Sequence, residues 1–140
     1  MYEYSCKVKR VVDGDTVDVM LDLGFDILYN CRVRLFGIDT PESRTRNLDE
    51  KARGKMASAF LKEAIDNGTK VVIQTKLKDS RGKFGRVLGN VVVDGKNINQ
   101  SMIENYHAAA YFGQNKEAIE AVHSANRTRL IELGLFKPVE

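Results

Sequence analysis

Residues 34–42, Arg-Leu-Phe-Gly-Ile-Asp-Thr-Pro-Glu, place an arginine, two carboxylates and a hydroxyl within one short stretch. Asp39 offers a carboxylate, and Thr40 offers a hydroxyl and a backbone carbonyl. These are the oxygen ligands that Ca²⁺ and other hard cations take from tight loops. Glu42 follows closely enough to face the same site across a water molecule, as a general base would. We therefore interpret this stretch as one side of a divalent-cation site for phosphodiester hydrolysis.

The same residues also suit the start of a helix. Asp39 would then be the N-cap, Pro41 would lie in the first turn and Glu42 would complete a capping box. That alternative requires an amphipathic run directly afterwards, and residues 43–47, Ser-Arg-Thr-Arg-Asn, show none. We favour cation binding and keep the helix start as the alternative.

Two other short segments carry side chains of related chemistry. Residues 13–16, Asp-Gly-Asp-Thr, are typical of a hairpin turn when taken alone. In a three-stranded meander, however, Asp15 would approach the end of the third strand and become a second carboxylate on the cation. Downstream, Lys83 and Arg86 lie in a glycine-rich basic segment. Arg34 and Arg86 taken singly are typical of solvated arginines, but two converging guanidinium groups would hold phosphate oxygens and stabilise charge in phosphoryl transfer.

The histidines and one aromatic pair are weaker candidates. His107 and His123 are far from the carboxylate segments in sequence, so we expect a structural or surface role for both and no general-acid role. Tyr111 and Phe112 precede a glycine and could stack on a base, although core packing explains them equally well.

The elements that must position these side chains follow from turn residues and hydrophobic alternation. Strands are predicted at residues 4–12, 16–21 and 27–36, joined by short turns as an antiparallel meander. Further along, the pattern predicts a helix at 48–67, strands at 70–75 and 86–93, and helices at 98–106 and 115–133. On the last helix the apolar residues are expected to face inward, namely Ala118, Ile119, Val122, Ala125 and Leu130. This order predicts an α+β, mainly β fold, a closed five-stranded OB-type (oligonucleotide/oligosaccharide-binding) barrel with three helices in one domain.

Composition limits the class of protein. The chain has 140 residues, of which 43% are hydrophobic and 29% charged, with a net charge of +3, as in ordinary soluble domains. Residues 70–86 contain six Lys and Arg against a single Asp, which suits a polyanionic partner or, equally, a solvated surface. Cys6 and Cys31 are expected to be small buried hydrophobes rather than a disulfide.

The N-terminal sequence and the hydropathy bear on location. No apolar run is long enough to cross a bilayer, and no secretory signal is visible. We therefore expect no membrane association and a cytoplasmic protein, in a bacterium or a virus-infected host cell, with secretion by another route left open. A monomer is the default expectation.

Taken together, these segments resemble the thermonuclease, or staphylococcal-nuclease-like, family. The resemblance rests on Val-Asp-Gly-Asp-Thr-Val at 12–17, Arg34, Asp-Thr-Pro-Glu at 39–42, Ala-Ser-Ala-Phe at 57–60 and Lys-Phe-Gly-Arg at 83–86. Their order and spacing agree over nearly the whole chain. The resemblance implies a five-stranded barrel with three helices, and Ca²⁺-dependent cleavage of DNA and RNA that leaves 3′-phosphate and 5′-hydroxyl ends.

The resemblance also implies a role for each residue of the carboxylate segments. Asp15 and Asp39 resemble the carboxylates that bind Ca²⁺ in this family, and Thr40 resembles its backbone-carbonyl ligand. Glu42 resembles the residue usually assigned as general base for the attacking water.

The positions that contact substrate match less completely. Arg34 and Arg86 resemble the two phosphate-binding catalytic arginines. Lys83 resembles a nucleotide-phosphate contact, and Tyr111 resembles a tyrosine near the nucleotide, although the alignment around it is loose. Phe84 stands where the family has a tyrosine, so one hydroxyl contact is lost.

The sequence therefore predicts a metal-dependent nuclease with Ca²⁺ as cofactor and DNA or RNA as substrate. The alternative is a non-catalytic nucleic-acid- or protein-binding module of the same fold. The complete set of acidic and basic groups favours the enzyme, because carboxylates in a pure binder would repel phosphate. The choice between DNA and RNA, the strandedness of the substrate and the choice between end and interior attack stay open.

Overall fold

The first three strands form the predicted antiparallel meander. The computed structural model describes residues 2–75 and 86–139. It begins with β1 (Tyr2–Asp13), β2 (Thr16–Asp22) and β3 (Leu28–Leu35), which pair in that order. Alternate residues of β2 and β3 are buried, so each strand turns one face to the core.

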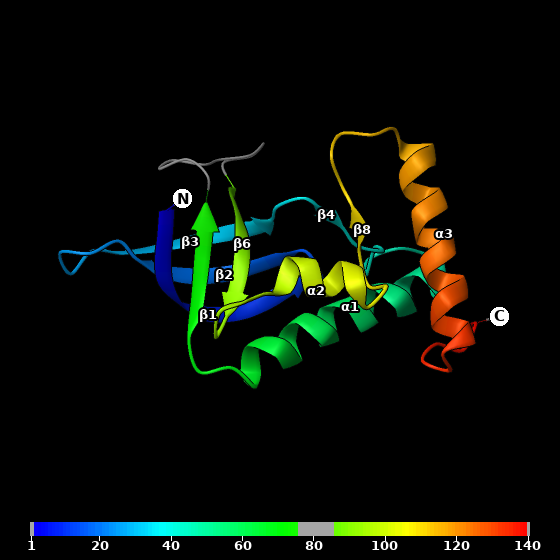
Figure 1. The fold of residues 1–140 in the computed structure, drawn as a ribbon, viewed down its shortest axis with the longest axis horizontal. Coiled ribbons are helices and arrows are strands. Elements are labelled where there is room, and N and C mark those ends of the chain that lie inside the picture. Colours follow the sequence, from blue (N-terminus) through cyan, green and yellow to red (C-terminus); the bar gives the residue numbers. More distant parts are fainter. Residues whose placement is uncertain (1, 76–85, 140) are drawn as a thin grey trace.

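Two later strands close the sheet into a barrel. β5 (Val71–Thr75) pairs antiparallel with β1, and β6 (Val87–Val93) pairs antiparallel with β5. β6 also pairs in parallel with β3, from Val33–Val87 to Leu35–Gly89, so the sheet returns to its first edge (Figure 1). The predicted five-stranded OB-type barrel is confirmed. Within the described residues, the structure also contains short strands that were not predicted, namely β4 (Ile38–Asp39), β7 (Lys96–Asn97) and β8 (Ala109–Ala110).

The three predicted helices are present as α1 (Leu48–Asp66), α2 (Ile98–Glu104) and α3 (Lys116–Glu132). Each begins after an asparagine whose side chain caps the first turn. Figure 1 shows α1 running along one side of the barrel and α3 standing at one end of the molecule beside β8. Because α1 begins after Asn47 and Asp39 lies in β4, the alternative of a helix start at Asp39 is wrong.

The core lies between the barrel strands, α1 and α2. Its fully buried side chains are almost all aliphatic, namely Val17, Val19, Val33, Leu35, Ile38, Ala57, Leu61, Ile73, Val91 and Met102. Cys6 and Cys31 form no disulfide with each other, and both are half-buried where burial was predicted. Burial, with a smaller contribution from Cys31, raises the pKa of the Cys6 thiol to about 11. In the part of the chain that the structure describes, no helix is long and apolar enough to cross a membrane.

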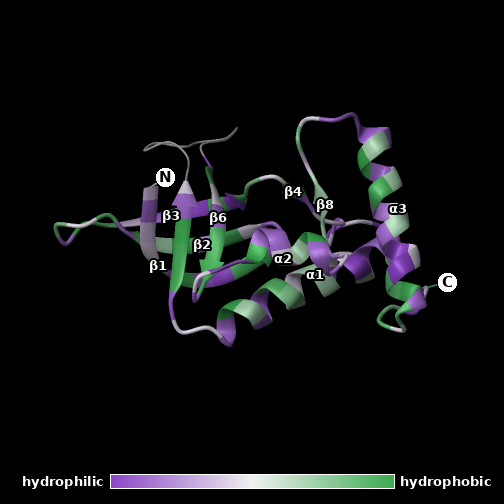
Figure 2. Cartoon of the chain, in the orientation of Figure 1, coloured by the Kyte–Doolittle hydropathy of each residue, from purple (hydrophilic) through white to green (hydrophobic). Residues whose placement is uncertain are grey.

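The inward face of α3 differs from the prediction. Ala118, Val122 and Ala125 are exposed, Ile119 is half-buried, and Leu130 alone of the predicted set is buried. Half-buried polar residues occupy the rest of that face, namely His123, Asn126 and Arg127. Figure 2 shows hydrophilic and hydrophobic residues intermixed along this helix, whereas β6 is mostly hydrophobic. The prediction failed because it followed apolar side chains, whereas α3 packs through polar ones.

Candidate active site

The turn between β1 and β2 places Asp15 at the end of β3. A Cβ atom on Gly14 would lie 2.7 Å from Cβ of Ala57, so glycine allows the turn to approach α1 closely. The backbone carbonyl of Asp15 accepts a hydrogen bond from Leu35 N at 2.8 Å. The hydroxyl of Thr16 donates to Asp15 Oδ1 at 2.9 Å. The Asp15 carboxylate is therefore fixed from both its backbone and its side chain.

Arg34 lies between two carboxylates. Its Nη1 donates to the Leu35 carbonyl at 3.0 Å and lies 3.4 Å from Asp15 Oδ2. Its Nη2 lies 3.9 Å from Asp39 Oδ1, and the side chain is only 18% exposed. One guanidinium group thus joins the first turn, the third strand and β4, which are separate segments of the sequence.

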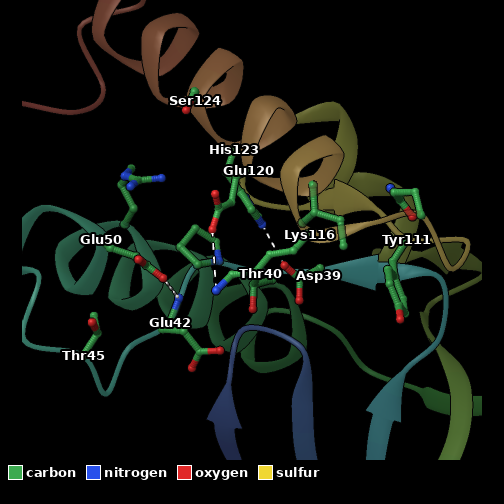
Figure 3. Close-up of a pocket in the computed structure, with 14 residues that line it drawn as sticks. Asp39, Thr40, Glu42, Thr45, Glu50, Tyr111, Lys116, Glu120, His123 and Ser124 are labelled. Carbon is green, nitrogen blue, oxygen red and sulfur yellow. Dashed lines mark hydrogen bonds and ion pairs between the residues drawn. The ribbon is translucent and has the colours of Figure 1, made fainter.

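Asp39 contacts a histidine from the last helix. β4 pairs with β8, where Asp39 lies opposite Ala109. Asp39 Oδ2 is 2.8 Å from Nε2 of His123, whose side chain is 15% exposed (Figure 3). The expectation of a structural or surface role for His123 overlooked this contact. The available signal was spacing, because Ile119, His123 and Leu130 fall on one face of α3.

His107 shows the structural role expected of it. Its ring lies 4.8 Å from the ring of Phe60, measured between centroids, and burial lowers the pKa of His107. Its ring contact is therefore with α1, which carries Phe60.

Glu42 is held through its backbone by α1. Its N–H donates to Glu50 Oε2 at 3.1 Å (Figure 3). A Cβ atom on Gly54 would lie only 2.6 Å from the Glu42 carbonyl oxygen, so the helix and the loop touch backbone to backbone. The carboxylate itself is exposed. Partial burial, followed by the nearby charges of Asp15 and Asp39, raises the pKa of Glu42 above its ordinary value.

The remaining predicted site residues are placed to different degrees. Thr40 is buried, between Asp39 and the loop that carries Glu42. Arg86 is half-buried and directly precedes β6, whose first residue pairs with β3 one position from Arg34. Lys83 lies outside the described residues.

A cavity of about 740 Å³ opens between the loop after β4, α1 and α3 (Figure 3). Asp39, Thr40 and Glu42 line it together with His123. Tyr111 also lines the cavity and is half-exposed. Its N–H donates a 2.7 Å hydrogen bond to the carbonyl of Gly37, between β3 and β4. The ionisable lining is mainly acidic, with Asp39, Glu42, Glu50 and Glu120 against Arg53, Lys116 and His123.

The donor set suits a hard cation. Within residues 2–75 and 86–139, no three His, Cys, Asp or Glu side chains form a preformed metal cage. The two carboxylates that face Arg34, Asp15 and Asp39, are oxygen donors of the kind that Ca²⁺ accepts and Zn²⁺ rarely uses. The same carboxylates raise the pKa of Glu42, so a divalent cation would offset an existing excess of negative charge. The residues therefore fit a Ca²⁺ ion.

Comparison of the sequence with known proteins identifies relatives of this chain. The family model described as staphylococcal nuclease homologue matches residues 32–131. Endonuclease YhcR of Bacillus subtilis is 33% identical over 116 residues, and the SPbeta prophage-derived endonuclease YokF of the same species is 36% identical over 95 residues. An uncharacterized endonuclease of Escherichia coli is 30% identical over 135 residues.

The relatives differ greatly in length. The matched regions cover 79% of this chain but 9% of YhcR, and 68% of this chain but 30% of YokF. With the Escherichia coli protein the match covers 96% of this chain and 78% of the relative.

Proposed function

We propose that this chain, which belongs to the staphylococcal nuclease homologue family, is a nuclease that hydrolyses phosphodiester bonds of DNA or RNA with Ca²⁺ as cofactor. The observation that carries the proposal is the convergence of Asp15 and Asp39 on Arg34, at 3.4 Å and 3.9 Å. The three relatives are all named as endonucleases, which supports the same reaction.

The cation would be held by the carboxylates of Asp15 and Asp39 and by the Thr40 carbonyl. When bound, it would supply Lewis-acid stabilisation of the charge on one phosphate oxygen. Arg34 already faces both carboxylates, so its guanidinium group would lie beside the same phosphate and hold a second oxygen. Arg86 is proposed as the second arginine on the phosphate.

Glu42 is proposed as the general base. It accepts a proton from a water molecule, whose oxygen bonds to phosphorus in line with the departing 5′-oxygen. The bond from phosphorus to the 5′-oxygen breaks, and a proton from solvent completes the 5′-hydroxyl. The products are a 3′-phosphate and a 5′-hydroxyl end.

Substrate contacts outside the reacting phosphate are proposed for two residues. Tyr111 lines the cavity with its ring half-exposed, where it can stack on a base. Lys83, which lies outside the described residues, is proposed as a contact to a flanking phosphate.

The experiment that tests the proposal is cleavage of labelled single-stranded DNA and RNA by the pure protein with Ca²⁺, with Mg²⁺ and with EDTA. We expect Ca²⁺-dependent cleavage that EDTA abolishes and Glu42→Gln nearly abolishes. Glu120→Gln is the matched control, because Glu120 lines the same cavity on α3 but has no proposed role. A circular substrate separates interior from end attack, and end-group analysis identifies the 3′-phosphate.

Binding of nucleic acid without cleavage under any metal would contradict the proposal. It would instead establish a non-catalytic binding module of the same family. If Glu120→Gln and Glu42→Gln lose activity equally, Glu42 has no specific role as the general base.

A further inference from the structure

We infer that His123 is a positioning residue that holds Asp39 in the orientation needed for cation binding; the inference rests on the proposed function. The contact joins the last helix to the cation site, 2.8 Å between His123 Nε2 and Asp39 Oδ2. An ionised carboxylate only accepts hydrogen bonds, so Nε2 carries the hydrogen and donates it. Figure 3 shows the imidazole reaching down from α3 toward the cavity floor.

The two carboxylates beside Arg34 are held in the same way. Asp15 accepts from the Thr16 hydroxyl on Oδ1 and turns Oδ2 toward Arg34. Asp39 accepts from His123 on Oδ2 and turns Oδ1 toward Arg34. Each carboxylate thus has one oxygen held by an outer donor and the other directed to the centre of the site. Outer donors of this kind orient metal ligands.

Asp39 needs such a donor more than a core residue would. It ends the two-residue strand β4, and its side chain is 34% exposed, so packing alone does not select its rotamer. Thr16, which donates to Asp15, is its neighbour in sequence. Among the described residues, the side-chain hydrogen bond to the Asp39 carboxylate comes from His123 and not from a neighbour in sequence. The donor comes instead from a helix far along the sequence.

The contact is not what docks α3. Arg127 donates to both oxygens of Asp49 at 2.9 Å and 3.0 Å, which joins α3 to α1. Asn126 donates to the Ala108 carbonyl at 3.2 Å, and Leu130 is buried. We therefore expect α3 to stay docked when the imidazole is removed. The Asp39 carboxylate alone then loses its hydrogen-bond donor.

The test compares His123→Leu, which removes the donor, with His123→Gln, whose side-chain amide can donate from nearly the same place. Ser124→Ala, on the same helix and cavity wall, is the control. Ca²⁺ affinity is measured by calorimetry without substrate, thermal unfolding is measured in EDTA, and kcat and KM are measured across Ca²⁺ concentrations.

We expect His123→Leu to weaken Ca²⁺ binding by roughly 10- to 100-fold with little change in unfolding in EDTA. Added Ca²⁺ should restore the kcat of His123→Leu, and its KM for nucleic acid should stay unchanged. His123→Gln should recover most of the Ca²⁺ affinity. Wild-type Ca²⁺ affinity in His123→Leu would overturn the inference. A second result would also overturn the inference: His123→Leu unfolds at a lower temperature in EDTA, by enough to account for its lost Ca²⁺ affinity, and His123→Gln does not recover that affinity. That result would indicate a structural role for His123.

The same data separate this inference from the proposed function. A wild-type protein that neither binds Ca²⁺ nor cleaves nucleic acid contradicts both. A wild-type protein that binds Ca²⁺ and cleaves, with His123→Leu unchanged, contradicts the positioning role alone.

Discussion

Gly54→Ala should lower activity and stability together, because it displaces the loop that carries Glu42. Gly54 lies within α1 and its missing side chain points at the loop that carries Glu42. A Cβ atom there would lie 2.6 Å from the Glu42 carbonyl oxygen and 2.8 Å from the Pro41 carbonyl oxygen. Both obstacles are backbone atoms, so no side-chain rotation relieves the clash.

The magnitudes decide which property changes. Ordinary contact begins at 3.4 Å, so the Glu42 backbone must retreat by about 0.8 Å. Alanine favours the helix by roughly 0.5–1 kcal/mol over glycine, but displacing backbone atoms works against that gain, because overpacking costs roughly 1–3 kcal/mol. We therefore expect the free energy of unfolding to fall by about 2 kcal/mol or less, equivalent to roughly 8 °C in Tm. A shift of about 1 Å in a catalytic group costs on the order of 100-fold in rate.

The assay is single-turnover cleavage at saturating Ca²⁺, alongside urea unfolding. Ala59→Gly is the control, since Ala59 is exposed on the same helix and should lose roughly 0.5–1 kcal/mol of stability with no loss of rate at temperatures well below Tm. Wild-type turnover in Gly54→Ala would show that contact with α1 does not set the position of Glu42, and would refute the reasoning.

Three further outcomes follow from the site and its supports. Arg34→Ala should lower kcat by an amount equivalent to roughly 2.7–4 kcal/mol with an unchanged circular dichroism spectrum; turnover near wild type would remove Arg34 from the mechanism. The pKa of Glu42 is raised from 4.5 by burial and neighbouring carboxylates, so its ionised form opposes folding as the pH rises above that value. Glu42→Gln in EDTA should then be more stable than wild type at pH 7 and lose that advantage in acid, as measured by urea unfolding at both pH values. The pKa of Asp49 is lowered from 3.8, chiefly by Arg127, so its contribution to stability is present above that pH and lost below it; Asp49→Asn should be less stable than wild type at pH 7, with the difference shrinking in acid.

The barrel and its first hairpin were accessible from the sequence because their signals are local. Alternating aliphatic residues and an Asp-Gly turn predict β1 and β2 directly, and their register brings Asp15 to the end of β3. The structure brings Asp15, Arg34 and Asp39 together as expected, while their catalytic and metal-binding roles stay predictions. The place of Lys83 also stays a prediction, since it lies outside the described residues.

What the sequence did not reveal depends on contacts between distant segments. The pairing of β4 with β8 involves two residues on each side, too few to leave a periodic pattern. The contact of His123 with Asp39 depends on how α3 docks, and α3 docks through an Arg127–Asp49 ion pair instead of an apolar stripe. A polar docking face has no hydropathy signature, so the helix was predicted correctly and its orientation was not.

The parallel pairing of β3 with β6 has a consequence for how the protein acquires activity as it folds. The meander of β1, β2 and β3 is built from contacts close in sequence, whereas α1 and β5 separate residues 33–35 from residues 87–89 along the chain. Pairings of such long sequence separation form late, because the chain entropy of closing the loop is lost before the contacts form. Arg34 and Arg86 lie on opposite sides of this last pairing. We therefore expect a refolding chain to remain inert toward nucleic acid until the barrel closes, so that recovered cleavage reports closure and not the earlier appearance of strands.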